Sequence, residues 1–248
     1  MVPAGSDEGR GNAATKRIGF ILVSTYAWTI VTAGVLVARF WQGHYHKVEV
    51  GLDDVAIIAA TVVYLGATVS WQHAIRGGLG KDLNALSGED ITLFFKAMYI
   101  AGILVVFAMA LAKLSSALLI DRVVPQTRRA KTILFGMIAI YAIFSPFAIS
   151  FQCGIAQWTT YSLRCNHGGL AIAVIVCNIT TDLFLVFWMV PVLWKLSLNK
   201  EKSLATATLF GVRAIVAFVA GGQIWATLRL ASSQNSTRDA AELAVLTQ

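Results

Sequence analysis

Asp182 and Arg213 are the residues of this chain whose type and position are best suited to chemistry. Each lies near the middle of an apolar stretch long enough to cross a membrane, Gly169–Trp194 for the aspartate and Ser203–Leu228 for the arginine. A charge at mid-bilayer is costly and is usually paired or functional. Counted along a helix, Asp182 lies roughly 18 Å and Arg213 roughly 15 Å from the same side of the membrane. The matching depths predict an ion pair between them.

Two more polar residues can join this pair. Asn178 lies four residues before Asp182 and shares its helix face. Lys113, in an earlier apolar run, either joins the group or extends toward the membrane surface. The functional interpretation is a ligand pocket or proton-linked switch built from Lys113, Asn178, Asp182 and Arg213. The structural alternative is an ion pair that only fixes helix packing, and a single pair favours this alternative.

The cysteines predict a disulfide rather than a metal centre. Cys153 and Cys165 bracket a polar loop, which suits a disulfide if the loop faces an oxidising compartment. Cys177 lies inside an apolar run and is expected to be a buried thiol. His167 is near, but no metal-ligand spacing accompanies it. We expect no metal and no cofactor; a retinal pigment needs a lysine deep in its last span, and none follows Lys202.

The composition predicts an integral membrane protein. The chain has 248 residues, of which 57% are hydrophobic and 13% charged, whereas soluble domains carry roughly a quarter charged residues. The net charge of +7 comes from short basic clusters between apolar runs. Such clusters fit loops that face anionic lipid better than a nucleic-acid surface. The expected partner is therefore the lipid bilayer, with no nucleic acid.

An all-α bundle of membrane-spanning helices follows from the length of the apolar runs, since about 20 apolar residues cross the hydrocarbon. Six runs qualify: Gly19–Phe40, Val55–His73, Ala97–Ile120, Thr132–Cys153, Gly169–Trp194 and Ser203–Leu228. Residues 1–18 form a polar tail, 19–230 the transmembrane domain, and 231–248 a tail or the start of an incomplete seventh helix. We expect six complete spans with the seventh missing or truncated. Asp53 and Asp54, just before the second run, are expected to cap its helix.

The basic residues give an orientation. Four lie in loop 121–131 and three in loop 195–202, but only one in loop 154–168. This contrast places the first two loops in the cytoplasm and the N-terminus outside, although the total count over all loops is even. The loop bracketed by the two cysteines and the glycosylation sequon Asn235-Ser236-Thr237 would then also be outside. Plasma membrane and endomembrane are not distinguished.

The ordered set of these residues resembles a known family, the fungal rhodopsin-like integral membrane domain, which has seven spans and receptor-like members. The set runs from about Ala27 to Arg238 and comprises Asp53, Asp54, Gly78-Leu79-Gly80, Lys113, Arg122, Cys153, Trp158, Cys165, Asn178, Asp182, Pro191, Arg213 and Arg229. Asp121-Arg122-Val123 is also similar to the acidic–arginine pair of G-protein-coupled receptors. The resemblance implies a receptor-like role, with a G protein or a small-molecule ligand as partner, and despite the family name it does not imply a chromophore. Lys81, where the family often has histidine, and the seventh span depart from the pattern.

A membrane-embedded enzyme is the rival class, for example a small multi-span cyclase that uses carboxylic acids. Asp182, Asp53 and Asp54 are its candidate proton donors. No paired carboxylates share a face at mid-membrane, so the sequence favours a protein that is not an enzyme and assigns no catalytic residue. Activity that survives Asp182→Asn would count against the enzyme, and ligand-dependent coupling to a G protein would favour the receptor.

Overall fold

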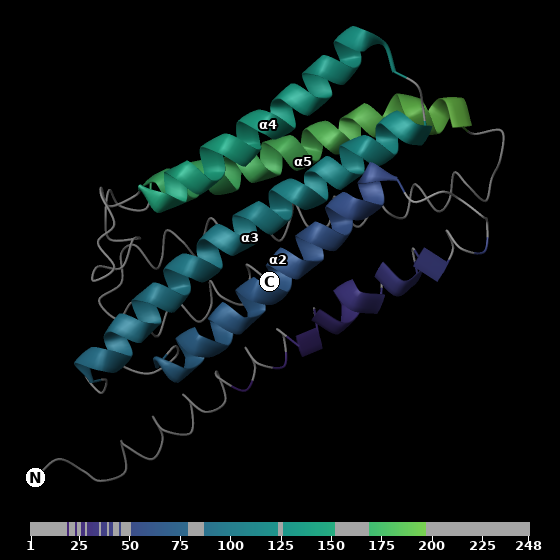
Figure 1. Ribbon diagram of the computed structural model, residues 1–248. Helices are drawn as coiled ribbons and strands as arrows, with labels where there is room; N and C mark the ends of the chain where they lie inside the picture. The colour runs from purple at the N-terminus through teal and green to yellow at the C-terminus, as the bar shows by residue number, and fades with distance from the viewer. Residues whose placement is uncertain are drawn as a thin grey trace, which may run out of the picture.

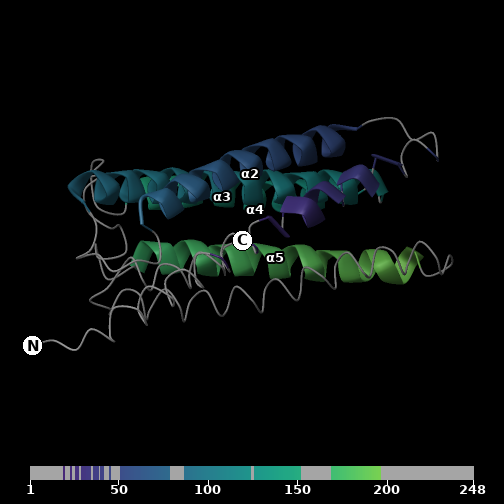
Figure 2. The same ribbon diagram turned by 90° about the horizontal axis from the view of Figure 1, so that it is seen from below.

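Four long helices form the described part of the molecule. The computed structural model describes residues 51–78, 87–123, 126–151 and 169–196, with separate positions between 19 and 45. The helices are α2 (Leu52–Arg76), α3 (Gly88–Val123), α4 (Arg128–Ser150) and α5 (Gly169–Leu196). Figure 1 shows them lying lengthwise beside one another, and Figure 2 shows α5 on one side of the layer that α2, α3 and α4 form.

The helices confirm the all-α fold class. Each is long and apolar enough to cross a membrane, and together they correspond to the second to fifth predicted spans. The described positions of the first run, Gly19–Phe40, are also helical. The sixth run, Ser203–Leu228, and the tail 231–248 lie outside the described residues, so the number of spans and the domain boundaries stay predictions.

Polar caps explain why the helices extend beyond the predicted apolar runs. Helix α3 begins nine residues before Ala97, because the Ser87 hydroxyl accepts a hydrogen bond from the Asp90 amide at 3.3 Å and donates one to Oδ2 of Asp90 at 2.8 Å. In α2, Oδ2 of Asp54 accepts a hydrogen bond from the Gly51 amide at 3.0 Å. Hydropathy alone misses such polar first turns.

The basic segment 121–131, predicted to be a loop, is mostly helical. Thr127 caps this helix, since its hydroxyl accepts a hydrogen bond from the Ala130 amide at 3.4 Å. Most of the residues predicted to form a loop therefore belong to the ends of α3 and α4. The charges lie on helix ends and not on a free connection.

Two apolar clusters show how α3, α4 and α5 run relative to one another. Near one end of the bundle Ala117, Ile120, Leu134, Ile138 and Leu185 pack together. Further along, Val106, Ala148 and Val174 form a second cluster. Residue numbers rise along α4 from the first cluster to the second but fall along α3 and α5. Helix α4 is therefore antiparallel to both neighbours, as expected for consecutive spans.

Large apolar side chains cover the outside of this bundle. Ile140 and Ile143 of α4 and Phe187 of α5 are 63%, 64% and 70% exposed. Water would make such a surface unfavourable, whereas lipid chains solvate it. The apolar exterior and the apolar core together fit helices surrounded by a bilayer.

Candidate functional site

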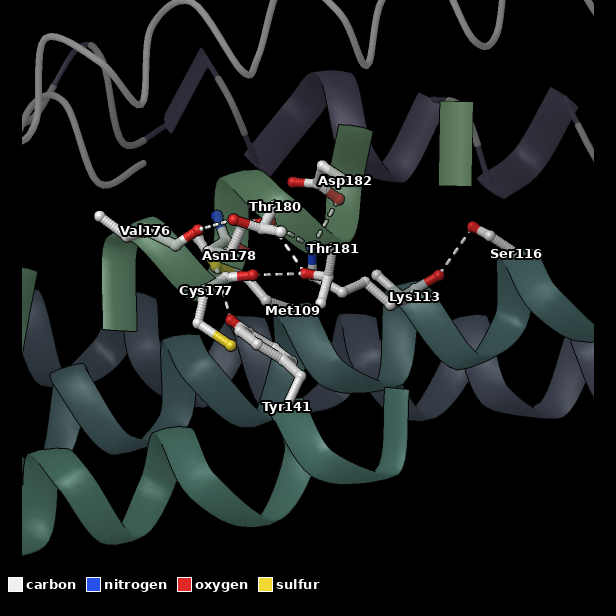
Figure 3. A network of polar contacts seen from close by, with 11 residues as sticks. Met109, Lys113, Ser116, Tyr141, Val176, Cys177, Asn178, Thr180, Thr181 and Asp182 are labelled. Atoms are coloured by element: carbon white, nitrogen blue, oxygen red, sulfur yellow. Dashed lines mark hydrogen bonds and ion pairs between the residues drawn. The ribbon is translucent and has the colours of Figure 1, made fainter. Parts of the chain in front are cut away.

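A buried ion pair joins α3 to α5. Nζ of Lys113 lies 2.5 Å from Oδ1 of Asp182, and the two side chains are 3% and 13% exposed. The same ammonium donates a hydrogen bond to the backbone carbonyl of Asn178 at 3.1 Å. Figure 3 shows these groups meeting between the two helices. The carboxylate and the carbonyl replace part of the water that the Lys113 amine loses on burial.

Helix geometry brings the three residues together. Asn178 and Asp182 are one turn apart on α5, so both lie on the face turned to α3. Thr181 adds local order there, because its hydroxyl donates to the carbonyls of Cys177 and Asn178, each at 2.9 Å. The Asn178 carbonyl thus accepts hydrogen bonds from both Lys113 and Thr181.

Helix α4 contributes an aromatic ring to the same site. Nζ of Lys113 lies 4.9 Å from the centre of the Tyr141 ring, and Tyr141 is fully buried. Its hydroxyl donates to Sδ of Met109 at 3.8 Å. A cation over a desolvated aromatic ring gains about 2 kcal/mol. The site therefore links three helices through one ammonium group.

The structure brings three of the four sequence-predicted site residues together: Lys113, Asn178 and Asp182. Arg213 lies outside the described residues, so the Asp182–Arg213 pair stays a prediction. Lys113 joins the group rather than extending to the membrane surface. Sequence reasoning missed Tyr141, because a tyrosine within an apolar run looks like any other aromatic residue. Its position far from the ends of the span was the available signal.

A second ionic cluster holds the end of α2 against the end of α3. Nη1 of Arg122 lies 3.2 Å from Oδ1 of Asp53 and 3.9 Å from Oδ2 of Asp54. The Ser115 hydroxyl donates to the Asp53 backbone carbonyl at 2.7 Å. The Asp53 side chain is 4% exposed and that of Arg122 37%, so the carboxylate is buried and the guanidinium reaches the surface.

The neighbouring residue Asp121 serves a different contact. Its Oδ2 lies 2.5 Å from Nζ of Lys131 on α4. The adjacent residues Asp121 and Arg122 therefore connect α3 to α4 and to α2, respectively. Sequence reasoning noted the Asp121-Arg122 pair and the caps Asp53 and Asp54 separately, without predicting that they meet.

The family follows from comparison with known proteins. The sequence model of the fungal rhodopsin domain matches residues 38–248. The chain belongs to the fungal rhodopsin domain family. No curated protein and no solved structure matches it. The predicted resemblance is thus confirmed, and the match includes all the residues of the two polar clusters.

The structure describes one of the three cysteines of this fungal rhodopsin domain. Cys177 is a free, half-buried thiol on α5. Cys153 and Cys165 lie outside the described residues, and their disulfide stays a prediction. Among the described residues no group of histidine, cysteine and carboxylate side chains is arranged to hold a metal ion.

The carboxylates of this domain are arranged for ionic contacts between helices. Asp182 is paired with Lys113, and Asp53 with Arg122. The enzyme alternative needs at least one of them as a proton donor to a substrate. In the described part of the chain, these two ion pairs join α3 to α5 and α2 to α3.

Proposed function

We propose that this protein is a receptor-like member of its family, in which the buried Lys113–Asp182 ion pair couples α5 to α3. The observation that carries the proposal is the pair itself, buried and in direct contact across two helices. Helix α3 is also bound to α2 through Arg122 and Asp53. A ligand that changes the first contact can thus shift a helix whose end forms the second.

The energies are of the right size for a switch. Breaking a buried ion pair by removing one partner costs of order 3–5 kcal/mol in soluble proteins. A ligand moves a two-state equilibrium from 1:99 to 99:1 with a differential affinity of about 5.5 kcal/mol. Competition for one charged partner therefore supplies a large share of the required bias.

The experiment measures nucleotide exchange on a heterotrimeric G protein by the purified chain in lipid nanodiscs. Lys113→Met and Asp182→Asn should raise basal exchange several-fold over wild type, because each removes the contact between α3 and α5. Thr180→Val is the matched control: this exposed threonine bonds only within α5 in the described structure. Exchange that stays at the control level in both folded variants would count against a G-protein-coupled receptor.

We also propose that the protein works without retinal. The Lys113 amine, which would have to be free and neutral to form a Schiff base, is held by a carboxylate and a carbonyl. Lys113 is the buried lysine of the described residues. Incubation with all-trans-retinal followed by borohydride reduction should leave the mass of every lysine peptide unchanged. A retinyl adduct on any lysine would contradict the proposal.

The orientation we propose places the N-terminus outside and the Arg122 end of α3 in the cytoplasm. The end that carries Arg122 also carries Arg128, Arg129 and Lys131 of α4, because these two helices are antiparallel and closely connected. Positive residues near span ends favour the cytoplasmic side.

The disulfide proposal rests on the same orientation. The end of α4 and the start of α5, which flank Cys153 and Cys165 in the sequence, both lie at the end of the bundle opposite the basic cluster. Closing this short loop should stabilise the fold by very roughly 3 kcal/mol in the chain-entropy model. Mass mapping of non-reduced peptides should show the Cys153–Cys165 crosslink. Free thiols at both positions would contradict the predicted disulfide and would weaken the argument for the proposed orientation.

A further inference from the structure

The basic residues at the α3–α4 end of the bundle fall into two groups. Arg122 and Lys131 each contact a carboxylate of another helix. Arg128 and Arg129, in the first turn of α4, are both exposed, and that turn contains no acidic residue. No ion pair of either arginine is found among the described residues. Two positive charges are therefore available to an anion from outside the chain.

An apolar surface continues from Arg129 along the outer face of α4. Ile133 and Ile140 lie four and eleven residues after Arg129, close to one and three helical turns, so the three side chains share this face. The two isoleucines are 52% and 63% exposed. Figure 1 shows α4 along the edge of the described helices. The outer face of α4 therefore carries a guanidinium at its end and apolar side chains below it.

Gly136 leaves an open space in this face between the two isoleucines. It lies three residues after Ile133 and four before Ile140, and a Cβ added to it would meet nothing within 4 Å. The space is roughly 10 Å from Arg129 along the helix axis. Half of the hydrocarbon layer measures about 15 Å. An acyl chain whose headgroup lies at Arg129 can therefore pass over Gly136 within one leaflet.

We propose that the outer face of α4 binds one phospholipid with an anionic headgroup, whose phosphate contacts Arg128 and Arg129 and whose acyl chain passes over Gly136. The two arginines are consecutive, with Cα atoms about 3.8 Å apart, so both reach one headgroup. A guanidinium binds phosphate through two parallel N–H donors. A headgroup with a net negative charge gains more from two cations than a zwitterionic one. A soluble anion would contact only the arginines and leave the apolar face unused.

The first experiment measures which lipid the wild-type protein retains. The protein is placed in nanodiscs of phosphatidylcholine with a minor fraction of phosphatidylserine and is released by native mass spectrometry. The lipid that stays bound should be enriched in phosphatidylserine over its share of the nanodisc. Absence of enrichment overturns the proposal, whatever the variants do.

Removal of the two charges tests the headgroup contact. Arg128→Gln/Arg129→Gln should lower the retention of phosphatidylserine roughly 25-fold, about fivefold for each arginine, from the usual attraction of one basic residue to anionic lipid. The control Arg76→Gln/Lys96→Gln removes the same charge from two exposed residues toward the opposite end of the bundle. It should retain as much phosphatidylserine as wild type. Equal losses in both variants would show only a general attraction and would overturn a site on α4.

Filling the space over Gly136 tests the position of the acyl chain. Gly136→Leu keeps both arginines and should lower the retention of phosphatidylserine several-fold, with a smaller loss for Gly136→Ala. Unchanged retention in Gly136→Leu would overturn the proposed path of the chain.

A headgroup without chains distinguishes a lipid from a soluble anion. Glycerophosphoserine, added at the same concentration as phosphatidylserine, should not displace the bound lipid. Displacement would show that the arginines take a soluble anion and would overturn the lipid as occupant. Because none of these measurements uses nucleotide exchange, failure of the receptor proposal would leave their results unchanged, and the reverse also holds.

Discussion

At the scale of single residues, the Lys113 amine lies inside the helix packing, and three contacts replace the water that it loses there. A carboxylate lies at 2.5 Å, a carbonyl at 3.1 Å and an aromatic ring centre at 4.9 Å. Sequence reasoning found the lysine, Asn178 and Asp182, because charged and amide residues are conspicuous in apolar runs. It predicted an Asp182–Arg213 pair, which lies partly outside the described residues, and left open whether Lys113 joins it, because depth along a helix does not fix how helices rotate toward each other.

Removing one member of the ion pair should cost more than removing both. We expect Lys113→Met and Asp182→Leu each to lower folded yield, by of order 3–5 kcal/mol of stability by analogy with soluble proteins; water defects in the bilayer reduce this cost. The double variant should recover part of the yield. The measurement is a double-mutant cycle on detergent-solubilised protein by size-exclusion fluorescence. Additive effects would show that the two residues do not interact.

Two substitutions of Tyr141 separate the contribution of its ring from that of its hydroxyl. Tyr141→Phe keeps the ring under Lys113 and loses the hydrogen bond to Met109, whereas Tyr141→Leu loses both. We expect the leucine variant to be less stable than the phenylalanine variant by about 1–2 kcal/mol. Thermal midpoints of both proteins provide the comparison. Equal midpoints would show that the Tyr141 ring does not stabilise Lys113.

At the scale of elements, the turn between α2 and α3 depends on close backbone approach. A Cβ at Gly77 would lie 2.7 Å from the Phe94 amide nitrogen, 2.9 Å from its Cα and 3.0 Å from the Asp90 carbonyl oxygen. The next residue, Gly78, has φ of 99°, which favours glycine. The apolar runs predict both helices, but only the structure shows where their backbones touch.

Gly77→Ala should therefore destabilise the protein, by about 1–3 kcal/mol as in other overpacked sites. Gly136→Ala in α4 is the control, since a Cβ there meets nothing within 4 Å. The control should gain about 0.5–1 kcal/mol from helix propensity. Thermal melts of the two variants should move in opposite directions. A Gly77→Ala protein as stable as wild type would show that the two helices separate easily.

At the other end of these helices, substitution of Arg122 and substitution of Asp53 should lower the stability by unequal amounts. Arg122→Met leaves the buried Asp53 carboxylate without this ion pair, at a cost of order 1–3 kcal/mol. Asp53→Asn leaves an arginine that is 37% exposed and can turn to solvent, at a cost of about 1 kcal/mol or less. Urea or thermal unfolding of both variants gives the order. The reverse order would mean that Arg122 is the group that needs the contact.

At the scale of the whole molecule, the up-and-down arrangement fixes which helix ends share a side. The α3–α4 connection and the C-terminal end of α5 lie at one end of the bundle, and the α2–α3 connection lies at the other. Alternation of consecutive spans was predictable from run lengths and loops. The absolute side was not, because the basic residues are evenly divided in total and only locally biased.

An epitope inserted after Thr127 should be accessible to antibody only after permeabilisation of the cell membrane. An epitope inserted after Gly78 should be accessible from outside without it, because that connection lies at the opposite end. Immunofluorescence on intact and permeabilised cells makes the comparison, if the protein reaches the cell surface; protease protection of sealed vesicles serves for internal membranes. The opposite pattern would reverse the orientation, and labelling of both from one side would contradict the helix directions.

The length of α3 has a mechanical consequence. Lys113 lies 25 residues from Gly88 and 10 residues from Val123, roughly 38 Å and 15 Å along the axis. A tilt about this attachment makes α3 a lever with unequal arms, whose Gly88 end moves about two and a half times as far as its Val123 end. Because the turn at Gly77 touches the Phe94 backbone, α2 must travel with the long arm. An angular change too small to disturb the packing around Lys113 would thus be magnified at the far side of the bundle.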